Sequence, residues 1–157
     1  MWTGKLESIF IGPRPGQPMV EMNQIRAVPG SGLEGDRYFI PEENSSKKTD
    51  AGREVTLIEI EALEALQRDY GITLQRGGSR RNLVTRAVPL NHLIGREFRV
   101  GEVTLRGIKL CEPCSHLAGL TEKKVLPALV HRGGLRAKIL TEGVLRVGDT
   151  IVPDLEG

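Results

Sequence analysis

The sequence predicts a mainly β fold, a barrel or sandwich of short, mostly antiparallel strands with a few peripheral helices. Glycine makes up 19 of the 157 residues, against a usual share of about 7%, which indicates many tight turns. Aromatic residues account for only 4% of the chain. Short runs of alternating apolar residues recur between glycine-containing pairs, a pattern typical of strands joined by turns.

Five stretches of sequence justify the predicted strands. A turn rich in glycine and proline separates a first strand, Gly4 to Ile11, from a second, about Met19 to Val28. The clearest hairpin runs from Phe98 to Leu105, where alternating residues flank a Gly-Glu loop. A second hairpin is predicted from Arg136 to Val147, and a last strand from Thr150 to Pro153. The C-terminal half is therefore expected to be mostly β.

One helix is predicted clearly, from Glu59 to about Tyr70, because apolar residues recur there at helical spacing. Its glutamates come early and Arg68 late, an order that suits the helix dipole. A shorter helix is expected between Thr121 and His131. The polar, unpatterned residues 41–52 predict a mobile surface loop.

Composition limits the classes of function. The length suits a single domain over residues 1–157. The net charge of +2 predicts neither nucleic-acid nor membrane binding. The first residues lack the pattern of a secretory signal, and no apolar run reaches the length of a membrane span. We therefore expect a soluble cytoplasmic protein.

Arginine is concentrated in one part of the chain. Residues 76–106 hold seven arginines, two glutamates and no lysine. The planar guanidinium suits phosphate or carboxylate, although a solvated basic strand would give the same pattern. Within this segment, adjacent glycines precede Arg80, Arg81 and Asn82. The glycines let backbone amides converge on an anion, which suits a phosphorylated heterocyclic ligand. A glycine-rich hairpin with solvated arginines explains the motif equally well unless other groups converge on it.

Two cysteines, Cys111 and Cys114, are separated by two residues. A disulfide between them would close too short a loop to stabilise the fold. The two cysteines therefore either have a chemical role or are buried as small apolar residues. A zinc site could add His116 and a more distant histidine, but no second paired motif exists, and no zinc is expected. A dithiol redox pair would need a βαβ arrangement of strands and helix around the two cysteines, whereas this pair lies among predicted hairpins. A sulfur carrier or metal-ligating thiolate needs only one cysteine that faces an anionic cofactor.

Six short motifs follow one another along nearly the whole chain. They are Gly32–Arg37, Arg53–Ile58, Arg80–Leu83, Leu110–Cys114, His131–Arg136 and Val147–Asp149. This is the order found in MOSC domains, which are named for the C-terminal domain of molybdenum cofactor sulfurase. Each motif is degenerate, but six in order are specific, and the sequence resembles a short stand-alone MOSC domain.

The resemblance implies a barrel-like fold and an association with a molybdenum-pterin cofactor or with sulfur delivery to metal centres. It makes Cys114 the candidate persulfide carrier and molybdenum ligand, with Cys111 as a thiol that could resolve the persulfide. Arg80 and Asn82 match the Arg-x-Asn element that contacts the cofactor in relatives, and Arg132 matches a loop arginine. Further anion contacts are expected from Arg37, Arg53 and Arg81.

The function implied is molybdenum ion and cofactor binding or sulfur carriage, so its catalytic activity would be that of a sulfur transferase or a cofactor-dependent enzyme. The partners implied are a cysteine-desulfurase-type sulfur donor or a molybdoenzyme acceptor. One alternative is a non-catalytic module for a small anion or a partner protein. Another, by analogy to some relatives, is a reductase of N-hydroxylated compounds. Pyridoxal phosphate belongs to the sulfurase's other domain and is not expected.

Overall fold

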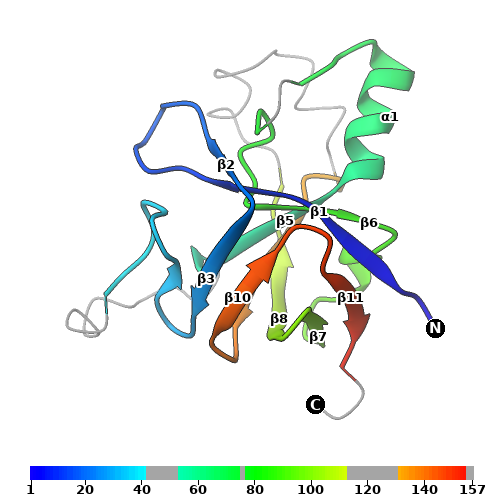
Figure 1. Ribbon diagram of the computed structural model, residues 1–157. Coiled ribbons are helices and arrows are strands. Elements are labelled where there is room, and N and C mark those ends of the chain that lie inside the picture. The colour runs from blue at the N-terminus through cyan, green and yellow to red at the C-terminus, as the bar shows by residue number, and fades with distance from the viewer. Residues whose placement is uncertain (42–52, 75–76, 113–130, 155–157) are drawn as a thin grey trace.

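The computed structural model describes residues 1–41, 53–74, 77–112 and 131–154, which form a closed β-barrel with an α-helix beside it (Figure 1). Around the barrel the strand order is β11-β7-β8-β9-β5-β6-β1. These strands are β1 (Gly4–Ile11), β5 (Val55–Glu59), β6 (Leu83–Arg86), β7 (Glu97–Val100), β8 (Val103–Leu110), β9 (Leu135–Ile139) and β11 (Thr150–Pro153). The predicted mainly β, barrel-like fold is confirmed.

The first strand closes the barrel because it is long enough to serve two neighbours on one edge. Its start pairs antiparallel with β11, Gly4 opposite Ile151. Its end pairs on the same edge with β2 (Val20–Met22), which lies outside the closed ring. Its other edge pairs with β6. Most of β1 is therefore paired on both edges, which leaves few unpaired backbone groups for pairing with other chains.

Alternating side chains fill the barrel interior. In the hairpin of β7 and β8, the inward residues Phe98, Val100, Val103 and Leu105 are all 0% exposed. They belong to one large cluster of buried residues that draws on every barrel strand. The predicted hairpin from Phe98 to Leu105 and the last strand, Thr150–Pro153, are confirmed.

A smaller sheet packs against the barrel, in the order β10-β3-β4. Its strands are β3 (Gln24–Val28), β4 (Gly32–Leu33) and β10 (Gly143–Arg146). The single strand predicted from Met19 to Val28 is wrong, because the chain changes sheets at Asn23, between β2 and β3. Val147 donates its N–H to the Asn23 carbonyl at this point.

The second predicted hairpin is also wrong. β9 and β10 form as expected, but β9 pairs with β5 and β8, whereas β10 pairs with β3. Both edges of β9 are thus occupied within the barrel, and no edge remains for β10. The short link between them is a crossover between two sheets.

The helix α1 (Ile60–Tyr70) follows β5 directly and ends at Gly71, as predicted. It covers a satellite cluster of Phe10, Ile58, Ala62 and Val84 on the outside of the barrel. The helix supplies the crossover that parallel neighbours require, since β5 and β6 are parallel. A 3-10 turn, η3 (Leu90–His92), follows β6. The predicted loop 41–52 and the helix expected between Thr121 and His131 lie outside the described residues, apart from their end residues Pro41 and His131.

Candidate functional site

Three of the predicted anion contacts come together around one aromatic ring. The guanidinium carbon of Arg37 lies 4.7 Å from the centre of the Tyr38 ring, and that of Arg53 lies 5.5 Å from it. Arg37 also donates a hydrogen bond to the Tyr38 hydroxyl at 3.2 Å. Arg80 is close enough for its charge to interact with Arg37 and Tyr38. We call Arg37, Arg53 and Arg80 the arginine cluster.

Arg80 is the most unusual member of the arginine cluster. Its backbone has a positive φ of 61°, which is uncommon outside glycine. Its Nη1 donates to the Gln17 carbonyl at 2.6 Å, whereas its buried Nη2 has no hydrogen-bond partner among the described residues. Burial lowers the pKa of Arg80, and the positive charge of Arg37 lowers it further. The charge of Asp36 acts in the opposite direction, so among the described residues the Arg80 cation is only partly compensated, and a bound anion would add to that compensation.

The nearby carboxylate of Asp36 is already used by the fold. It accepts the backbone N–H of Gly12 at 2.8 Å and that of Tyr38 at 3.3 Å. Glycine is needed at position 12, since a Cβ there would lie 2.8 Å from the Met19 sulfur and 3.2 Å from Arg37 Nη1. The end of β1 and the turn that carries Arg37 are therefore held in close contact.

Arg81 and Asn82, also predicted to contact a cofactor, make hydrogen bonds within the fold. Arg81 is 8% exposed and donates to the Gly133 carbonyl at 2.8 Å and to the Cys111 carbonyl at 3.2 Å. Asn82 is 7% exposed, and its Nδ2 donates to the Phe10 carbonyl. Its Oδ1 accepts from the N–H and the hydroxyl of Thr56. Both side chains connect strands and loops at the wall of the barrel.

The two cysteines differ in what the structure says of them. Cys111 is 5% exposed at the end of β8, and its N–H donates to the Gly134 carbonyl at 2.7 Å. Among the described residues it has no disulfide partner. Cys114, the candidate sulfur carrier and metal ligand, lies outside the described residues. The structure therefore places Cys111 next to Arg81 and the 133–134 loop.

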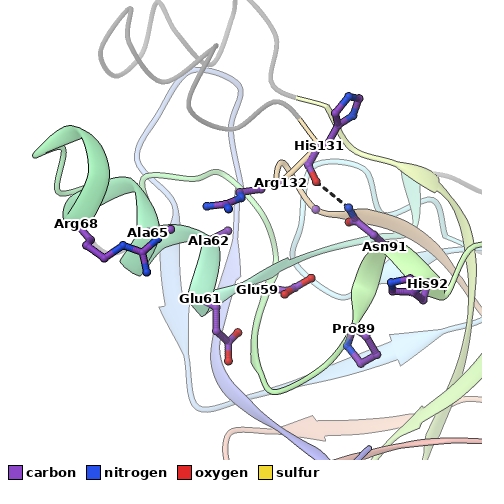
Figure 2. Close-up of a pocket in the computed structure, with 11 residues that line it drawn as sticks. Glu59, Glu61, Ala62, Ala65, Arg68, Pro89, Asn91, His92, His131 and Arg132 are labelled. Carbon is purple, nitrogen blue, oxygen red and sulfur yellow. Dashed lines mark hydrogen bonds between the residues drawn. The ribbon is translucent and has the colours of Figure 1, made fainter.

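Arg132 lies in a separate pocket of about 590 Å³ between the start of α1, η3 and the loop before β9 (Figure 2). The arginine cluster contributes no residue to its described lining. The charged and titratable residues that line it are Glu59, Glu61, Arg68, His92, His131 and Arg132. We call this cavity the Glu59 pocket.

The electrostatics of the Glu59 pocket depend mainly on Glu59 itself. Burial raises the pKa of Glu59, and the negative charge of Glu61 raises it further. The backbone N–H of Leu90 and the charges of Arg132 and His92 act in the opposite direction. From the sequence, these glutamates are expected only to suit the helix dipole. Only the fold brings them to the loop of Arg132.

The sequence and the fold are similar to those of known proteins. The family model of the MOSC domain matches residues 44–152. The chain belongs to the MOSC family. YuaD from Bacillus subtilis superposes on this MOSC domain with a TM-score of 0.79 and 16% identity, over 96% of this chain and 97% of that one. YiiM from Geobacillus stearothermophilus gives a TM-score of 0.71 and 16% identity, over 98% of this chain and 76% of that one.

YiiM from Escherichia coli is similar to this MOSC domain at a TM-score of 0.67 and 15% identity, over 98% of this chain and 70% of that one. At this identity the likeness shows the fold. No curated protein matches the sequence. Neither described helix of this MOSC domain could cross a membrane. Among residues 1–41, 53–74, 77–112 and 131–154, no group of three or more His, Cys, Asp or Glu side chains could hold a metal ion.

Proposed function

We propose that this MOSC domain binds a molybdenum-pterin cofactor, with the arginine cluster holding the phosphate of the pterin. The observation that carries the proposal is the buried Nη2 of Arg80, which has no partner among the described residues. MOSC domains are associated with molybdenum cofactor, so family and local chemistry point the same way.

The arginine cluster suits a phosphate in charge. Arg80 and Arg37 are neighbouring cations, and Asp36 is turned to backbone N–H groups. A phosphate oxygen that accepts from a guanidinium gains about 1.5–3 kcal/mol per charge-assisted bond. Its negative charge would also offset the desolvation and the repulsion from Arg37 that lower the pKa of Arg80. When bound, the cofactor supplies redox and oxygen-atom chemistry at molybdenum.

The sulfur chemistry is assigned to Cys114, because Cys111 is buried. As a ligand, a Cys114 thiolate would bind molybdenum as a soft donor. As a carrier, it would attack the terminal sulfur of a donor persulfide, forming a Cys114 persulfide as the donor thiolate leaves. The donor would be of the cysteine-desulfurase type and the acceptor a molybdoenzyme.

Cofactor binding is tested by the metal and pterin content of the protein purified from a molybdenum-replete host. The wild type is expected to carry molybdenum and, after oxidation, a fluorescent pterin. The molybdenum and pterin contents of Arg80→Gln should each be lower by about 10-fold or more, because at least one charge-assisted bond is lost. Arg99→Gln is the control, since Arg99 is exposed on β7.

Equal cofactor content in the wild type, Arg80→Gln and Arg37→Gln would contradict the proposal. Saturable binding of inorganic phosphate without molybdenum or pterin would support the alternative, a non-catalytic small-anion module. For the sulfur step, a donor loaded with labelled sulfane sulfur is mixed with the wild type and Cys114→Ser. Label on the wild type alone supports Cys114 as the carrier, and equal label on both excludes it.

A further inference from the structure

The Glu59 pocket holds opposite charges that do not neutralise each other. Glu59 enters it from the end of β5, and Arg132 enters from the loop before β9 (Figure 2). The charge of Arg132 acts on Glu59 and opposes the rise in its pKa. Within the described part of the chain, however, neither side chain forms an ion pair. A carboxylate and a guanidinium thus face one cavity without direct contact.

The other charges of the Glu59 pocket are already engaged. Arg68 binds the carboxylate of Asp69 through two hydrogen bonds, of 2.7 and 2.9 Å. One carboxylate oxygen of Glu61 accepts the N–H of Ala87 at 2.9 Å, and the other is buried, with no hydrogen-bond partner among the described residues, so that it is not exposed to a ligand. His131 lies 3.5 Å from a carboxylate oxygen of Glu112. Besides the exposed His92, Glu59 and Arg132 are left as the charges available to a ligand.

The loop that carries Arg132 is held in place from both sides. Asn91, in η3, donates its side-chain N–H to the His131 carbonyl at 2.8 Å (Figure 2). On the other side, Arg81 binds the Gly133 carbonyl. Two hydrogen bonds that flank Arg132 reduce the cost of ordering the loop when a ligand binds.

From these contacts we propose that the Glu59 pocket binds a small zwitterion, an α-amino acid with an apolar side chain. Its ammonium would donate to Glu59 and its carboxylate would accept from Arg132. Ala62, Ala65 and Pro89 also line the cavity and offer an apolar wall to the side chain. A volume of about 590 Å³ lies within the range of small-molecule sites.

The charges explain why both ends of the ligand are needed. An amine alone would leave the Arg132 guanidinium without an anion, and a carboxylic acid alone would leave Glu59 without a cation. Glu59 is partly desolvated, the condition that raises its pKa, and a charge pair formed there is stronger than one in open water. The proposal does not depend on cofactor binding, since the arginine cluster shares no residue with this pocket.

The test uses three matched probes: L-leucine, 3-methylbutylamine, which lacks its carboxylate, and 4-methylpentanoate, which lacks its ammonium. Binding is measured by calorimetry and by amide NMR shifts. The wild type should bind leucine at least about 10-fold more tightly than either half, as one charge-assisted bond predicts. The shifts should fall on the start of α1 and on residues 132–134.

Variants then assign each end of the ligand. Glu59→Gln should bind leucine and 4-methylpentanoate equally, and Arg132→Gln should bind leucine and 3-methylbutylamine equally. Glu64→Gln is the control, because Glu64 is exposed on α1 and lies outside the pocket lining. This variant should behave as the wild type. The proposal is overturned if the wild type binds leucine no better than its halves or not at all, or if both pocket variants keep the wild-type preference. Loss of molybdenum content in Arg80→Gln would not affect this result.

Discussion

Replacing Arg81 by methionine is expected to lower the free energy of unfolding by about 3 kcal/mol. Methionine keeps much of the side-chain volume but removes the donors to the carbonyls of Gly133 and Cys111. Both bonds involve a charged donor, and a buried carbonyl left without a partner costs about 1–3 kcal/mol. The end of β8 and the loop before β9 would therefore lose the side chain that connects them. Urea unfolding followed by circular dichroism measures the change.

The neighbouring arginine provides the matched comparison. Arg80→Met should change the free energy of unfolding much less than Arg81→Met, because the loss of the exposed bond to the Gln17 carbonyl is offset by the removal of a cation that burial and Arg37 both disfavour. It should nevertheless weaken phosphate binding. Equal stability of Arg81→Met and the wild type would show that the bonds of Arg81 carry no net stability. A loss of stability in Arg80→Met as large as that in Arg81→Met would contradict the inference that the Arg80 charge is only partly compensated.

This pair of arginines shows how far the sequence predicts the site. The motif Arg80-Arg81-Asn82 contains one arginine that the fold brings close to Arg37 and Tyr38, and one that binds within the fold. Composition cannot distinguish a guanidinium that binds backbone carbonyls from one that lacks a partner. That difference is set by Cys111 and Gly133, which are distant in sequence.

The fold was predictable where the signal is local. The alternation of β7 and β8 around Gly101-Glu102 and the helical spacing before Gly71 each specify an element on their own. The pairing of β9 was not predictable in this way, because the link to β10 resembles a hairpin turn. The choice is made by β5 and β8, which occupy both edges of β9. The Glu59 pocket depends on the same long-range assembly.

Gly134→Ala is expected to lower the free energy of unfolding by about 4 kcal/mol or more. A Cβ at this position would lie 2.0 Å from the Leu57 carbonyl oxygen, a backbone atom in the middle of β5. The φ of Gly134 is 110°, which also disfavours any residue with a side chain. Relief would require β9 to move away from β5.

Gly148→Ala separates the two causes of that loss. Gly148 also has a positive φ, 93°, but a Cβ there meets nothing within 4 Å. It should therefore show only the backbone strain, about 1–2 kcal/mol. A similar loss for both variants would mean that strain alone accounts for Gly134→Ala and that β5 and β9 can separate at little cost. A much larger loss at position 134 would show that the glycine of the His131-Arg132-Gly133-Gly134 motif is needed for the contact between β5 and β9, which also positions Arg132 over its pocket.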